Sequence, residues 1–215
     1  KNYKIILKNW KNFLNLNFNI LLRSLLLQMV ILYHIFWGTN LNTNLLTVNQ
    51  IFILFLNFAV YVLDGFAFSA EVLVGNAVGK RNKNEIKNSF LICLVWSGVF
   101  GLILSLFYFL FTIYIIQIMT YDSEILELSK EYLFLIAIIP LTGFFSWTID
   151  GVFLGATETK LMRDTMLIST LFYFFLVLIF SKYHFYGLWI SLNVFFVFRG
   201  FILMIYFPKI TKKYI

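Results

Sequence analysis

Charged residues are scarce in this sequence. Only 13% of the 215 residues are Asp, Glu, Lys or Arg, whereas 61% are hydrophobic and the mean hydropathy is +0.86. No charged residue occurs from Asn88 to Tyr121, a stretch longer than the roughly 20 residues that a helix needs to cross a bilayer. A soluble domain carries about 25% charged residues. The composition therefore excludes a soluble domain and predicts an integral membrane protein.

Other features are missing too. Cys93 is the single cysteine, which excludes an internal disulfide and a two-cysteine metal site. There is no signal peptide with a small-residue cleavage site, and the first residue is Lys1, so we expect a fragment. No nucleophile stands with a base and no His pairs with Asp, so we expect neither an enzyme nor a metal or cofactor. The apolar segments lack strand alternation, which predicts an all-α membrane protein.

Six membrane spans are predicted. No charged residue separates Arg23 from Asp64, yet one helix over this stretch would extend about 60 Å, so the segment Gly38 to Asn44, rich in Asn and Gly, must be a turn. The same reasoning divides the rest of the chain. The predicted spans are 20–37, 45–78, 90–118, 132–154, 165–180 and 185–207, preceded by a cytoplasmic linker (1–19) and followed by a basic tail (208–215).

Basic residues lie almost entirely on one side of these spans. Thirteen Lys and Arg fall in the N-terminal segment, the second loop, the fourth loop and the tail, whereas only Lys130 and Lys182 fall on the other side. This asymmetry predicts that both termini are cytoplasmic and that the protein resides in the plasma (inner) membrane. It also explains the net charge of +7 without a nucleic-acid partner. The loop from Tyr121 to Glu131 is expected to be outside and is acidic.

A polar stripe follows the second span. Gln50, Asn57, Asp64 and Glu71 recur every seven residues and climb about 31 Å along one helix. Lipid does not solvate two carboxylates and two amides, so the stripe is expected to face other helices or a water-filled cavity. A polar track through a membrane is typical of a transporter. Cavity-lining candidates are Gln28, Asn49, Gln50, Asn57 and Trp147, with interhelical hydrogen bonding as the alternative role for the four amides.

Five ionisable side chains lie within or at the edges of the predicted spans. Placing a charged Arg or Asp side chain at the centre of a membrane helix costs at least ~2.5 kcal/mol, so we expect these side chains to be paired or hydrated. Three interpretations stay open: locking of helices, gating of the cytoplasmic side, and direct handling of a proton or cation. The two arginines are expected to be structural and to snorkel to the interface. These transport or gating candidates are Arg23, Asp64, Glu71, Asp150 and Arg199.

Proline and histidine add two local predictions. Pro140 lies ten residues before Asp150 and lacks a backbone N–H, which predicts a kink in the fourth span. His34 and His184 fall near the outer ends of spans, far from the acids, and are expected to be interfacial anchors rather than metal ligands.

These residues give the chain a family resemblance. It resembles the C-terminal half of a multidrug and toxin extrusion (MATE) transporter of the DinF-like branch, over nearly all of the sequence after about residue 19. The stretch Asp-Gly-Phe-Ala followed by Ala-Glu is the most specific element. The matching elements are Asn49-Gln50, Leu63 to Gly75 with Gly79, Ile149 to Thr157 with Arg163, Leu188-Trp189 and Phe198 to Gly200, together with Arg23 and Gln28.

The resemblance implies one half of a twelve-helix antiporter. Such a protein has two six-helix bundles and expels mostly cationic organic compounds in exchange for H⁺ or Na⁺. The coupling aspartate of this branch belongs to the first helix of the other bundle, so no coupling site is assigned to this chain. The alternatives are a lipid-linked precursor flippase, which requires a basic cavity, and a non-transporting structural subunit.

Overall fold

The computed structural model describes residues 2–39 and 41–213, with side chains described from Trp10 onward except at position 12. Lys1, Asn40 and residues 214–215 lie outside the described part of the chain. Strands do not occur in the described residues. The helices are α1 (Asn2–Gly38), α2 (Thr43–Gly79), α3 (Lys83–Met119), α4 (Ser123–Ala137), α5 (Ile139–Gly155), α6 (Thr159–Phe180), the 3₁₀ turn η1 (Ser181–Tyr183) and α7 (His184–Lys213).

In the described residues, five apolar helical stretches are long enough to cross a membrane, and one of them divides into two helices, which gives six segments. The helices α1, α2 and α3 have 37 residues each, about 55 Å, which exceeds the roughly 30 Å hydrocarbon core. Together α4 and α5 form a fourth segment. The apolar stretch from Thr159 to Lys213 has 55 residues and would measure about 82 Å as one helix, but η1 divides it into α6 and α7. The predicted all-α fold is confirmed, and each predicted span lies within these helical segments.

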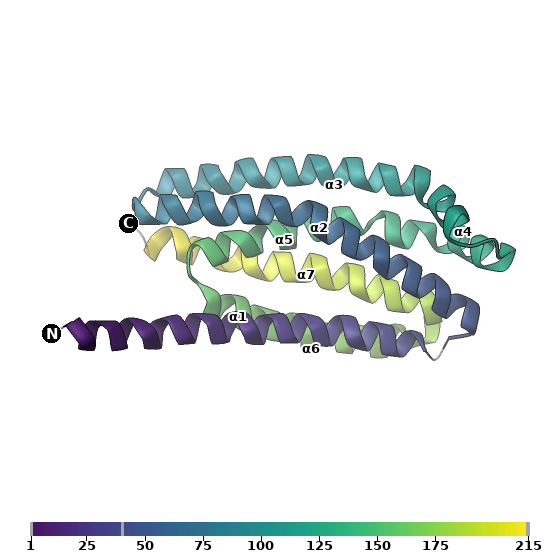
Figure 1. Cartoon of the computed structure of the whole chain (residues 1–215), viewed down its shortest axis with the longest axis horizontal. Coiled ribbons are helices and arrows are strands. Elements are labelled where there is room, and N and C mark those ends of the chain that lie inside the picture. Colours follow the sequence, from purple (N-terminus) through teal and green to yellow (C-terminus); the bar gives the residue numbers. More distant parts are fainter. Residues whose placement is uncertain (1, 40, 214–215) are drawn as a thin grey trace.

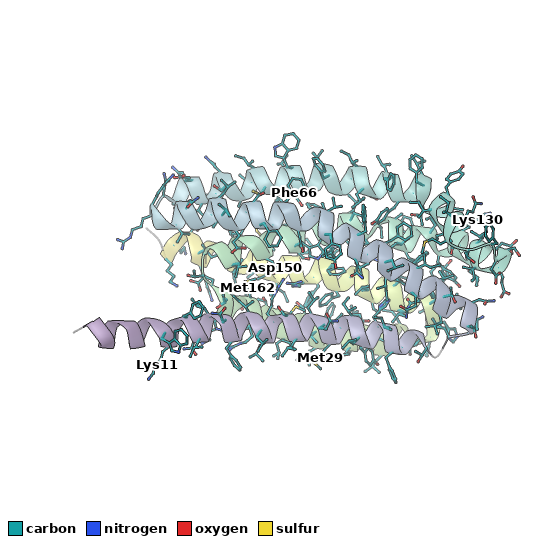
Figure 2. The ribbon with its side chains drawn as sticks, viewed as in Figure 1. Lys11, Met29, Phe66, Lys130, Asp150 and Met162 are labelled. Atoms are coloured by element: carbon teal, nitrogen blue, oxygen red, sulfur yellow. The ribbon has the colours of Figure 1, made fainter. Side chains whose placement is uncertain are left out.

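The segments run back and forth, so the N and C marks lie at the same end of the bundle (Figure 1). The helices α2 and α3 lie side by side, α5 and α7 run through the middle, and α1 packs on α6 (Figure 1). Although α1 and α2 are consecutive, they diverge from the turn that joins them and pack on different neighbours (Figure 1). Lys11 and Lys130 lie toward opposite ends of the molecule (Figure 2).

Side-chain caps fix where several helices begin. Asn42 accepts a hydrogen bond from the backbone N–H of Leu45 at 2.8 Å, so α2 starts at the end of the predicted asparagine-rich turn. Asp122 caps α4 in the same way, accepting from the N–H of Glu124 at 2.9 Å. The stretch from Tyr121 to Glu131 is therefore mostly helix, and its prediction as a loop was wrong. Acidic groups in a first helical turn also favour the helix dipole.

The described residues near both ends of the chain, from 2 and up to 213, are helical as well. Residues 2–19, which we predicted to be a linker, continue without a break into the first span within α1. Residues 208–213 of the predicted tail belong to α7, and Lys213 Nζ lies 2.5 Å from a carboxylate oxygen of Glu158 beyond the end of α5. That residues 2–19 connect two bundles stays a prediction.

Pro140 marks a real interruption. The helix breaks at Ile138, and Pro140 occupies the first turn of α5. Backbone carbonyls that lose helical donors at such a break need other partners. Ser105 Oγ on α3 donates to the carbonyl of Ala137 at 2.7 Å, and Asn193 Nδ2 on α7 donates to the carbonyl of Leu135 at 3.2 Å. The helix break lies next to Pro140, and side chains of α3 and α7 donate hydrogen bonds to two of the carbonyls beside it.

Two glycines bring α5 against α2. A Cβ at Gly151 would collide with the backbone of Ala67, and one at Gly155 would collide with the backbone of Glu71. The spacing Gly-x-x-x-Gly lets helix backbones approach closely in membranes, where no hydrophobic force drives helices together. This approach fixes the part of α2 that carries Asp64 and Glu71 against the part of α5 that carries Asp150.

We predict that Gly151→Leu lowers the melting temperature of the complete protein in detergent, because the added side chain forces α2 and α5 apart. Overpacking of this kind costs about 1–3 kcal/mol or more. The matched control is Gly65→Leu, since nothing lies within 4 Å of a Cβ at Gly65. Equal melting temperatures for the two variants would contradict the close approach of the helices.

Candidate membrane-embedded cavity

A cavity of about 460 Å³ lies where α1 and α2 diverge. Its walls come mainly from these two helices, and α5 forms its floor with Trp147, Asp150 and Gly151. Leu154 of α5, Met162 of α6 and Phe196 of α7 complete the lining. The volume is in the range of pockets that hold small organic molecules. The polar and charged residues that line it are Arg23, Gln28, Asn57, Asp64, Glu71 and Asp150.

At the floor of the cavity, Asp150 binds two arginines. Arg23 Nη2 from α1 lies 2.5 Å from Asp150 Oδ2, and Arg199 Nη2 from α7 donates to the same oxygen. Asp150 lies in the interior of the bundle (Figure 2). The Arg199 side chain is only 1% exposed, so it does not snorkel to the interface as predicted. Pairing with Asp150 compensates the burial of its charge, which explains how the interior tolerates it.

The polar stripe of α2 reaches the cavity with three of its four members. Asn57, Asp64 and Glu71 line it, together with Gln28 from α1 and Trp147 from α5. Asp64 and Glu71 are half-buried and lie in the walls of the bundle rather than on its outer face. In the described chain, neither carboxylate has a hydrogen bond or an ion pair within 4 Å.

The fourth residue of the polar stripe, at its outer end, does not line the cavity. Gln50 is exposed and does not line the cavity. The cavity does not extend this far along α2, because Ile53, about one helical turn beyond Gln50, is the first residue of the helix that lines it. Asn49, its neighbour, is fully buried, and its Oδ1 accepts from Trp189 Nε1 at 2.9 Å. Asn49 is therefore an interhelical contact between α2 and α7, which is the second of the two roles that the sequence left open for it.

The predicted role of His34 as an interfacial anchor was wrong. It is 1% exposed, its Nδ1 lies 3.2 Å from the hydroxyl of Tyr173, and its ring packs edge-on against Trp189 with centroids 4.8 Å apart. These contacts join α1 to α6 and α7, so His34 is a core residue and not an interfacial anchor. His184, in contrast, is exposed at the start of α7.

Two kinds of site residue escaped the sequence analysis. Phe68 and Phe196 form aromatic parts of the cavity wall, but aromatic residues are 20% of the chain and carry no distinguishing signal. The spacing Gly151-x-x-x-Gly155 was a readable signal, since it is a known pattern for close helix contact in membranes.

With this geometry in place, the chain can be compared with known proteins. A family profile described as MatE matches residues 20–181, which is most of the chain. The chain belongs to the MatE family. It is 32% identical over 192 residues to DNA damage-inducible protein F of Escherichia coli (strain K12), covering 89% of this chain and 42% of that protein.

Solved structures share the fold of this MatE chain. A MATE in the bent conformation superposes with a TM-score of 0.79 at 16% identity, over 93% of this chain and 45% of that one. A MOP superfamily transporter from Pyrococcus furiosus, whose binding pocket has reversed polarity, gives a TM-score of 0.76 at 18% identity, with the same coverage. This MatE chain thus spans less than half the length of the proteins it matches.

We predict that Asp150→Asn destabilises this MatE protein by about 3–5 kcal/mol, because it leaves two arginine charges without their carboxylate. Detergent-solubilised protein would show this as a lower melting temperature. The control is Glu85→Gln, which removes the ion pair of 2.6 Å between Glu85 and the exposed Lys80 and is expected to cost less than ~1 kcal/mol. Similar losses for both variants would show that the Asp150 contacts do not stabilise the bundle.

Proposed function

We propose that this chain is the C-terminal six-helix half of a secondary active antiporter. The complete protein exports organic cations, drugs or metabolites in exchange for H⁺ or Na⁺. Two bundles rock against each other, so that the cavity opens in turn to each side of the membrane. Small organic, mostly cationic molecules are its substrates, and lipid and the N-terminal bundle are its other partners.

The observation that carries this proposal is the cavity between α1 and α2. It combines apolar and aromatic walls with two amides and two carboxylates that lack ion-pair partners in the described chain. Binding sites for small molecules have this composition, with a mostly apolar surface and a few polar groups that orient the ligand. Acidic side chains at membrane depth are costly and typically mark a pathway for a substrate or an ion.

The missing half of the relatives' length supports a second bundle. The chain covers 42–45% of the proteins it matches, which leaves room for six further spans. In our proposal that N-terminal bundle supplies the opposite wall of the cavity and the coupling site. Arg23, Asp150 and Arg199 then have a supporting role, because they form ion pairs with one another within this half.

The proposed orientation places both chain ends in the cytoplasm and the protein in the plasma (inner) membrane. Thirteen Lys and Arg belong to the side of the termini and only two to the other side. The positive-inside rule supports this orientation.

The charges of the cavity disfavour the alternatives. A lipid-linked precursor flippase has to bind phosphates, yet one arginine and three carboxylates line this cavity. A non-transporting structural subunit does not require an open polar cavity whose carboxylates lack ion-pair partners in the described bundle.

To test the function, the complete protein would be expressed in cells that lack their main efflux pumps, and accumulation of a panel of fluorescent organic cations would be measured. We expect lower accumulation than in cells with empty vector. Unchanged accumulation across the panel, with the protein present in the membrane, would contradict the proposal. Asp64→Asn is expected to reduce export without loss of membrane insertion, whereas Glu85→Gln serves as the control outside the cavity.

A further inference from the structure

The five intramembrane charges divide unequally. Arg23 and Arg199 carry two positive charges, and Asp64, Glu71 and Asp150 carry three negative ones. Counting them leaves one negative charge in excess. Which carboxylate holds this excess decides where a positively charged ligand is attracted, because charges in a poorly solvated cavity interact strongly.

Asp64 belongs to the arginine network. It makes no direct ion pair, but it interacts electrostatically with Arg23, Arg199 and Asp150. Together these four side chains sum to zero, since two arginines face two aspartates. The network is therefore electrically complete within the six helices, and a ligand cation gains little net attraction from it.

Glu71 stands outside this network. Among the residues that the structure describes, its carboxylate has no hydrogen bond and no ion pair within 4 Å. It lies seven residues beyond Asp64 on α2, about 10.5 Å further along the helix. Its backbone is held against Gly155 of α5, so its position in the cavity wall is fixed.

The surroundings of Glu71 suit an organic cation. Phe68, one helical turn before it, lines the same cavity with a ring that is 64% exposed, and Leu154 adds apolar surface. An aromatic face attracts alkylammonium groups. An inorganic ion such as Ca²⁺ would require six or more oxygen ligands, which a single carboxylate does not supply.

We propose that Glu71 is the residue that selects a positive charge in the substrate, and that it acts as the counter-ion of a single alkylammonium group packed against Phe68. The inference rests on the proposed transport function and assigns the charge specificity to one side chain. Asp64, in contrast, keeps the arginine network neutral.

The test compares two probes of the same shape. One is a fluorescent aryl trimethylammonium ion, and the other is the same dye with a tert-butyl group in place of the trimethylammonium. In the complete protein, Glu71→Gln is expected to raise KM for the cation by about tenfold to a hundredfold and to leave KM for the neutral dye unchanged. Glu71→Asp is expected to retain part of the preference. Glu124→Gln removes an exposed carboxylate outside the cavity and is expected to change neither value.

The outcomes separate the two proposals. If the unsubstituted protein moves neither dye, the proposed transport function is contradicted for this ligand class. If it moves the cation and Glu71→Gln affects both dyes equally or neither, the role of Glu71 is overturned while the transport function stands.

A measurement on the unsubstituted protein covers the case in which Glu71→Gln fails to fold. Dicyclohexylcarbodiimide, which modifies carboxyl groups in apolar surroundings, is expected to label Glu71, and peptide mass spectrometry locates the label. The trimethylammonium dye should suppress labelling at Glu71, and the neutral dye should not. Suppression at Asp64 instead, no suppression, or no label at Glu71 would each overturn the inference.

Discussion

A charge inside a bilayer must find an opposite charge or water, and this constraint organises the interior of the bundle. Asp150 meets it by binding Arg23 and Arg199, which come from the first and last helices of the chain. The contact therefore joins three helices that are far apart in the sequence, with Arg23 lying 127 residues before Asp150. Removal of Asp150 leaves both arginine charges without their carboxylate, so the two ion pairs depend on one residue.

The cavity follows from how the helices on either side are held. Gly151 and Gly155 have no side chains that would keep the two backbones apart, so α2 packs closely on α5. On the other side, α1 packs on α6 and reaches α5 through Arg23. Since the two walls have different anchors, α1 and α2 stay apart and the space between them is not closed by packing. The same contacts that stabilise the bundle thus create the cavity of about 460 Å³.

The sequence predicted the six spans, the turn after Gly38, the break at Pro140 and the inward position of Asp64 and Glu71, because these depend on hydropathy, backbone chemistry and the face of one helix. It misplaced His34 and left two roles open for Asn49, because the environment of both residues depends on which helices become neighbours. It also missed that α4 begins nine residues before the predicted span, although Asp122 followed by Ser and Glu is a readable cap signal. Local rules therefore sufficed for the elements, whereas the pairing of helices decided the polar contacts.

Compensated and uncompensated charges suit different tasks in such a bundle. The two arginines and their two aspartates are neutral as a set. Their mutual attraction stabilises the bundle whether or not a ligand is bound, so it can hold the helices together through a transport cycle. A carboxylate without a partner is stabilised electrostatically only while a cation is bound, and this stabilisation ends when the cation is released. A transporter must both bind and release its substrate. Several unpaired carboxylates would bind a cation more tightly and release it more slowly, so one unpaired carboxylate beside an apolar wall is better suited to turnover. The division of charges between Asp64 and Glu71 on one helix is consistent with this requirement.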